Sequence, residues 1–230
     1  AMERFLFRLS QSQYSARFIL KGALMLRVWE APELRPTMDI DMLGRTDNAI
    51  EPLLEQIREI LAADVVDDGI TFIQDSLKAE SITEDADYEG VRVRFTGELS
   101  NARVNMQLDI GFGDTVHPEP EMKSFPTLLE FDAPSLLCYS RESAIAEKFE
   151  AMVKLGELNS RMKDFYDIWL LARQFDFELA SLREAIEHTF ARRKTGLPGA
   201  IQFPHDFAER KQTQWLAFHR RLNQDHVPDR

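Results

Sequence analysis

Hydrophobic and polar positions follow two different periods along this chain, and the change between them divides it into two parts. Residues 103–111 alternate between apolar and polar side chains, which is typical of a half-buried strand, and shorter strand-like runs precede them. In the last third, apolar residues recur every three or four positions, which indicates amphipathic helices. A mixed part followed by an all-helical part predicts an α+β fold, with domains at residues 1–138 and 139–230.

The individual elements follow from the same two patterns. Apolar alternation predicts strands at residues 17–20, 37–43, 70–76, 91–97 and 103–111. Helical spacing predicts helices at residues 3–15, 23–29, 48–63, 142–158, 162–174, 179–193 and 206–223. The stretches at residues 30–36 and 117–126 contain several prolines and are expected to be loops.

Composition narrows the setting in which the protein works. The single cysteine, Cys138, excludes an internal disulfide framework and is expected to pack in the core, as in proteins of a reducing cytoplasm. No run of about 18 apolar residues is present, so we expect no membrane-spanning helix and no membrane partner. The first residues do not resemble a secretory signal peptide. These observations together predict a cytoplasmic location.

Charge is distributed unevenly along the chain. The net charge is −11, and residues 47–90 alone hold thirteen acidic residues against two basic ones, so the remainder is formally neutral. This acidic segment is expected to form a solvated face and to repel phosphates. Residues 183–221 hold eight basic residues against four acidic ones. If the protein binds RNA, we expect the contacts in this region, for example at Arg192, Arg193 and Lys194.

Carboxylates at strand positions are the main candidate chemistry. Asp39 and Asp41 are two positions apart in a predicted strand, so they point to the same face, where two carboxylates need a cation or water. Asp109 lies on the polar face of the later strand, and Gly22 stands where a strand meets a helix that could receive phosphate. Three carboxylates beside a phosphate site suit one or two Mg2+ ions that hold a nucleoside triphosphate.

Four stretches resemble one family of enzymes. They read "LKGALMLRVW", "RPTMDIDML", "QLDIGFGD" and "RMKDFYDIWLL", in this order along the chain. They are similar to the AbiEii/AbiGii toxin family, which belongs to the DNA polymerase beta-like nucleotidyltransferase superfamily and provides toxins of type IV toxin–antitoxin systems. The resemblance implies a nucleotidyltransferase-like mixed β-sheet with flanking helices at residues 1–138, followed by a C-terminal helical bundle at residues 139–230.

The resemblance also implies roles for individual residues. The metal ligands, for Mg2+ or Mn2+, would be Asp39, Asp41 and Asp109, of which Asp109 would also assist deprotonation of the attacking hydroxyl. Asp114 lies further along the same motif. The nucleotide would be bound near Lys21, Gly22, Ala23, Arg35 and Thr37. The catalytic residues contributed by the helical part would be Lys148, Asp164 and Asp167.

Taken together, the residues and the resemblance predict a nucleotidyltransferase toxin that depends on Mg2+. It would transfer a nucleotide from a nucleoside triphosphate to an acceptor hydroxyl, on an RNA such as the tRNA 3′ end or on a protein, and release pyrophosphate. The cognate antitoxin would be of the transcriptional-regulator type, acting without a stable complex.

Two alternatives remain open at this stage. The first is a non-catalytic binding module with the same fold, which is favoured by Ala23, because the superfamily usually has a second glycine or a serine at that position. The second is a metal-dependent phosphodiesterase or nuclease that uses the same acids and needs no triphosphate.

Overall fold

The computed structural model describes residues 1–31, 36–84, 88–200 and 203–222. The chain forms two compact units. Unit 1 consists of Ala1–Asp114 and Glu119–Tyr139, and unit 2 consists of Thr115–Pro118 and Ser140–Arg230. Strands are concentrated in the first and helices in the second, so the predicted α+β fold class is confirmed.

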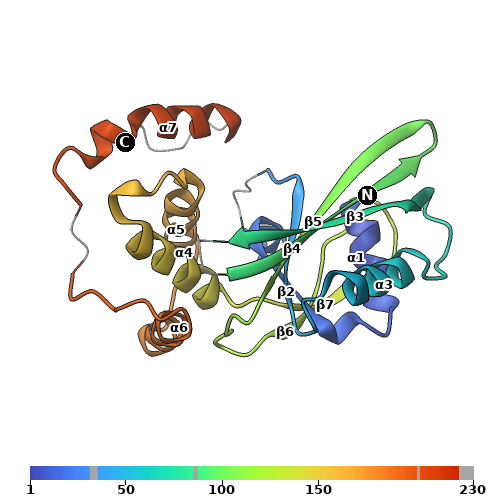
Figure 1. Ribbon diagram of the computed structural model, residues 1–230, viewed down its shortest axis with the longest axis horizontal. Coiled ribbons are helices and arrows are strands. Elements are labelled where there is room, and N and C mark those ends of the chain that lie inside the picture. Colours follow the sequence, from blue (N-terminus) through green and yellow to red (C-terminus); the bar gives the residue numbers. More distant parts are fainter. Residues whose placement is uncertain (32–35, 85–87, 201–202, 223–230) are drawn as a thin grey trace. The chain divides into compact units, whose positions relative to one another are not determined.

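Unit 1 is built on a seven-stranded mixed sheet with the order β3-β4-β5-β2-β1-β7-β6 (Figure 1). Its strands are β1 Phe18–Lys21, β2 Asp39–Gly44, β3 Ile70–Glu84, β4 Tyr88–Leu99, β5 Ala102–Phe112, β6 Glu121–Ser124 and β7 Ser135–Cys138. β2 runs parallel to β5 and β1 runs parallel to β7, whereas the other neighbours are antiparallel.

One face of this sheet is apolar and carries the core of unit 1. Strand alternation places a single set of buried side chains on that face: Ile40, Met42, Val91, Val93, Phe95, Met106, Leu108 and Ile110. The helices of this unit are α1 Met2–Gln11, α2 Met25–Val28 and α3 Ile50–Leu61, with 3-10 turns η1 Ser15–Arg17 and η2 Gly22–Leu24. Phe5 of α1 packs against the rings of Phe72 and Phe95, so α1 helps to cover the apolar face. The opposite face carries polar side chains, together with the buried apolar residues Ile19 and Leu43.

Part of the acidic segment is buried rather than solvated. Asp68 accepts hydrogen bonds from Nη1 of Arg8 at 2.7 Å and from Nη2 at 3.1 Å, and its side chain is 2% exposed. Burial raises the pKa of Asp68, but the hydrogen bonds and charge of Arg8 outweigh it and leave the pKa below its usual range. The expectation of a uniformly solvated acidic face is therefore wrong at Asp68, which joins α1 to the start of β3.

Unit 2 is helical, as the spacing of its apolar residues predicts. It contains α4 Arg141–Leu155, the 3-10 turn η3 Gly156–Leu158, α5 Met162–Gln174, α6 Leu179–Arg192 and α7 Phe207–Leu222 (Figure 1). The Ser140 hydroxyl accepts a hydrogen bond from the backbone N–H of Ser143 and caps the start of α4. Aromatic contacts link the helices in pairs: Phe149 of α4 with Phe190 of α6, and Tyr166 of α5 with Phe218 of α7.

A buried ion pair fixes the end of α6 against α4. Glu150 is fully buried, and it accepts hydrogen bonds from Nη1 of Arg193 at 2.9 Å and from the Thr195 hydroxyl. Because the Arg193 side chain is only 6% exposed, the prediction that it contacts RNA is wrong. Arg192 and Lys194, on either side of it, are exposed.

Several elements differ from the sequence-based expectations, and one of them, β7, was not predicted at all. Residues 117–126 were expected to be a loop but contain β6, a four-residue edge strand whose side chains are all exposed and therefore show no alternation. β3 continues to Glu84 because a register shift between Ile73 and Lys78 interrupts its pattern without ending the strand. The helix expected at 23–29 begins as η2. Among the described residues, no helix is both long and apolar enough to cross a membrane.

We expect Cys138 to be unreactive in the folded protein. It lies on β7, is buried, and burial raises the pKa of its thiol to about 12, so almost no thiolate is present at neutral pH. Intact mass after treatment with iodoacetamide at neutral pH should show no adduct without denaturant and one adduct in urea. Rapid labelling of the native protein would contradict the burial of this side chain.

Candidate functional site

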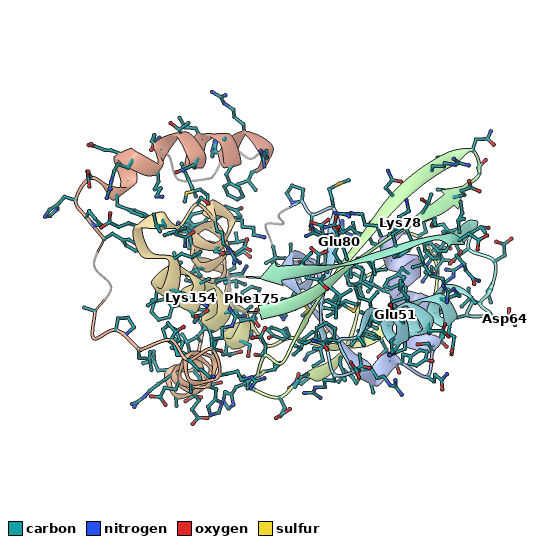
Figure 2. The ribbon with its side chains drawn as sticks, in the orientation of Figure 1. Glu51, Asp64, Lys78, Glu80, Lys154 and Phe175 are labelled. Atoms are coloured by element: carbon teal, nitrogen blue, oxygen red, sulfur yellow. The ribbon has the colours of Figure 1, made fainter. Side chains whose placement is uncertain are left out.

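A row of charged residues crosses five strands on the polar face of the sheet in unit 1. Direct pairing places Glu80 of β3 opposite Arg92 of β4, and Arg92 opposite Asp109 of β5. Asp109 pairs with Asp41 of β2, and Asp41 pairs with Lys21 of β1. Directly paired residues point to the same face of a sheet, so these five side chains form one continuous row. Figure 2 labels Glu80, at the β3 end of the row.

A second row lies beside the first. It runs from Lys78 through Arg94 and Gln107 to Asp39. Lys78, which Figure 2 labels next to Glu80, and Arg94 are exposed. Nη1 of Arg94 lies 2.7 Å from a carboxylate oxygen of Glu80. The polar face therefore carries both acidic and basic side chains, with two acids side by side at Asp109 and Asp41 and two bases at Lys78 and Arg94.

The arrangement of Asp39 and Asp41 matches the strand prediction. Ile40 between them is fully buried, and both aspartates are half-buried on the polar face. The Thr37 hydroxyl exchanges hydrogen bonds with the backbone of Asp39 at 3.2–3.3 Å, so Thr37 shapes the start of β2. Arg35, the basic residue predicted nearby, lies outside the described residues.

Gly22 brings the backbone at the end of β1 against the carboxylate of Asp41. Its φ is +74°, and a Cβ atom built on it would lie 2.0 Å from Oδ2 of Asp41. Only glycine satisfies both the positive φ and this close approach. Gly22 begins the three-residue turn η2, in which Ala23 is buried, and the α-helix that follows, α2, has only four residues and cannot give a strong macrodipole.

Gly22→Ala is expected to lower the free energy of unfolding by about 1–2 kcal/mol from backbone strain alone, and by more where Asp41 is displaced. Gly69→Ala is a matched control, because Gly69 has the same φ of +74° but its Cβ would meet only Leu99 at an ordinary 3.4 Å. Urea unfolding of both variants measures the difference. Equal losses in the two variants would show that the contact with Asp41 is unimportant.

Lys21, predicted near the nucleotide, is buried and faces another carboxylate. Its Nζ lies 3.5 Å from Oδ2 of Asp114 and 5.8 Å from the ring centre of Tyr139. Asp114 therefore neutralises the lysine at the β1 end of the row. Lys21 and Asp114 bring a compensated pair of charges next to Asp41.

Asp109 is held by an arginine that the sequence analysis did not single out. The carboxyl is buried, and Nε and Nη2 of Arg92 donate to its two oxygens at 2.8 and 2.7 Å. Gln107 also donates to Oδ2 at 3.3 Å. The hydrogen bonds that Arg92 donates to Asp109 raise the pKa of Arg92, with smaller contributions from the charges of Asp109, Asp39 and Glu80. The sequence carried no signal for this pair, because it depends on the register between β4 and β5.

Unit 2 gathers the three catalytic residues that were predicted for the helical part. Nζ of Lys148 on α4 lies 3.3 Å from Oδ1 of Asp164 and 2.9 Å from Oδ2 of Asp167, both on α5. Asp164 and Asp167 are buried, and Arg161 forms an ion pair with the other oxygen of Asp164. Two carboxylates and two cations thus form a compensated cluster, which we call the lysine cluster.

The carboxylates of unit 1 fit a divalent ion in part. Oxygen atoms of Asp39 and Asp41 are the ligand type that Mg2+ and Mn2+ prefer, and the pair lies on one face of β2. Among the described residues, however, no three acidic, histidine or cysteine side chains are arranged to hold a metal ion. Both oxygens of the third carboxylate, Asp109, are turned toward Arg92.

Similarity to known proteins extends over most of the chain. The family model described as "Nucleotidyl transferase AbiEii toxin, Type IV TA system" matches residues 4–229. The crystal structure of JHP933 from Helicobacter pylori is similar with a TM-score of 0.45 and 16% identity, covering 96% of this chain and 90% of that one. A second crystal structure, of an H. pylori protein assigned as a nucleotidyltransferase, has a TM-score of 0.44 and 15% identity, covering 99% and 95%. No curated protein matches the chain.

Proposed function

The chain belongs to the AbiEii nucleotidyl transferase toxin family of type IV toxin–antitoxin systems, and we propose that it transfers a nucleotide from a nucleoside triphosphate to an acceptor hydroxyl with the help of Mg2+ or Mn2+. The observation that carries the proposal is the in-register placement of Asp41 and Asp109, next to Asp39 and against Gly22. Carboxylates grouped in this way on one sheet face suit the binding of a metal–triphosphate complex.

The proposed reaction is an in-line displacement at the α-phosphorus. The acceptor oxygen forms a bond to this phosphorus while the bond from the phosphorus to the oxygen that bridges to the β-phosphate breaks, and pyrophosphate leaves. Asp39 and Asp41 would hold the divalent ion, which would supply stabilisation of the negative charge that develops during the displacement. Asp109 is the proposed acceptor of the hydroxyl proton.

We assign the lysine cluster of unit 2 a positioning role toward phosphate, which the family resemblance implies for Lys148. Asp164 and Asp167 hold the ammonium group of Lys148 from two sides, so its position is fixed before any phosphate binds. An ammonium group held in this way can contact phosphate oxygens without a further loss of side-chain entropy. Lys148 would then contribute its charge to phosphate binding.

The acceptor and the partner are parts of the proposal that follow from the family. We propose an RNA acceptor, such as the tRNA 3′ end, with a protein hydroxyl as the competing outcome of the test. The cognate partner would be an antitoxin of the transcriptional-regulator type, and the protein would act in the cytoplasm.

The test is incubation with Mg2+, each labelled nucleoside triphosphate in turn, and total cellular RNA or protein. Label on RNA or on protein, with release of pyrophosphate, would support transfer and identify the acceptor. Cleaved RNA without incorporation would indicate a nuclease instead. Absence of both, together with no nucleotide binding in equilibrium dialysis, would favour a non-catalytic binding module.

A further inference from the structure

Arg92 holds the one carboxylate that is needed to complete the metal site. Its Nε and Nη2 reach both oxygens of Asp109 at 2.8 and 2.7 Å, in the fork geometry that gives arginine–carboxylate pairs their strength. We propose that Arg92 is an internal cation that competes with the divalent ion for Asp109 and thereby sets the metal affinity of the site. This inference rests on the proposed function, since it assumes that Asp39, Asp41 and Asp109 bind the metal.

Electrostatics explains why a cation is needed at this position when the metal is absent. Asp109 is 7% exposed and lies directly opposite Asp41, with Asp39 on the same face. A buried carboxylate beside another carboxylate is costly unless a positive group compensates it. Arg92 supplies that positive charge from the neighbouring strand. A divalent ion would supply the same compensation, so the two cations are alternatives at Asp109.

The exposure of the arginine distinguishes this pair from a purely structural one. The Arg92 side chain is 29% exposed, so its guanidinium can leave Asp109 for water without opening the core. The pair of Arg8 and Asp68 has similar bond lengths, but both of those side chains are less than one-tenth exposed. Glu80 and Asp39 interact electrostatically with Arg92 and offer the released guanidinium nearby negative charge.

The test is titration of the whole protein with Mn2+, with free Mn2+ measured by electron paramagnetic resonance. Arg92→Gln should bind Mn2+ about tenfold more tightly or better, because the ion no longer has to displace a charge-assisted, bidentate hydrogen bond. Arg92→Lys keeps the charge without the fork and should lie between the parent and Arg92→Gln. This second variant also serves if Arg92→Gln is too unstable to titrate.

Arg94→Gln is the matched control. Arg94 is two residues away on the same face of β4, and its ion pair is with Glu80 at the exposed end of the row. Its removal should change the Mn2+ affinity by less than about twofold, since exposed ion pairs contribute little. An affinity that is unchanged or weaker in Arg92→Gln, or equally raised in Arg94→Gln, would overturn the inference.

Asp41→Asn separates failure of this inference from failure of the proposed site. If Asp41→Asn loses Mn2+ binding while Arg92→Gln keeps the parental affinity, the proposed metal site is supported. Only the competition between Arg92 and the metal is then contradicted. If Asp41→Asn binds Mn2+ as tightly as the parent, the metal binds elsewhere. Both the proposed metal site and the competition by Arg92 are then contradicted. If the parent binds no Mn2+, binding gained in Arg92→Gln supports competition, and binding in neither protein contradicts it.

Discussion

Asp41→Asn is expected to reduce nucleotide transfer by about 10³-fold or more while the fold is retained. Asp41 lies next to both Asp39 and Asp109 on one sheet face, so we expect the proposed metal site to depend on it more than on any other single carboxylate. Loss of metal binding removes several kcal/mol of charge stabilisation from the transition state, and each 1.4 kcal/mol is about tenfold in rate. Incorporation of labelled nucleotide measures the loss of transfer, and urea unfolding of the same variant shows whether the fold is retained.

Most substitutions lower the free energy of unfolding, but Asp41→Asn is not expected to do so. Neutralising one of several adjacent carboxylates removes a repulsion, so the free energy of unfolding should stay constant or rise. Asp64→Asn makes the same chemical change at an exposed position after α3, labelled in Figure 2, and should leave both quantities unchanged. Full transfer activity in Asp41→Asn, or its unfolding, would remove Asp41 from the metal site.

Local patterns were sufficient to predict the face on which the carboxylates lie. Strand alternation alone places Asp39 and Asp41 together and Asp109 on a polar face, because side-chain direction depends only on neighbouring residues. Pairing between strands is non-local, so the sequence could not reveal that Arg92 lies opposite Asp109 or that Lys21 faces Asp114. The Arg92–Asp109 pair depends on the register between β4 and β5, and the Lys21–Asp114 pair depends on the path of the chain after β5.

The helical unit shows the same division between local and non-local information. The spacing of Asp164 and Asp167 predicts that they share one side of α5, but their contact with Lys148 depends on how α4 packs. The sequence predicts Arg193 as a surface cation, because it lies at the end of a helix among other basic residues. Its burial against Glu150 depends on a partner 43 residues away, which no local pattern reports.

Lys148→Met is expected to lower the free energy of unfolding by about 3–5 kcal/mol, because it leaves buried carboxylates without their shared cation. Asp164 is fully buried and would keep only Arg161, while Asp167 would lose the ammonium group 2.9 Å away. Urea unfolding measures the loss. Lys163→Met, at an exposed position beside Asp164 on α5, is the control and should change stability by less than about 0.5 kcal/mol.

A double variant separates the structural role of Lys148 from a role in nucleotide binding. In Lys148→Met combined with Asp167→Asn, one buried negative charge is removed together with the positive one, and Asp164 and Arg161 still balance each other. We therefore expect the double variant to recover most of the lost stability. If its affinity for the triphosphate remains low, as measured by equilibrium dialysis, the ammonium group contacts phosphate. If affinity returns together with stability, Lys148 serves only to neutralise the buried aspartates, and the positioning role assigned to it is wrong.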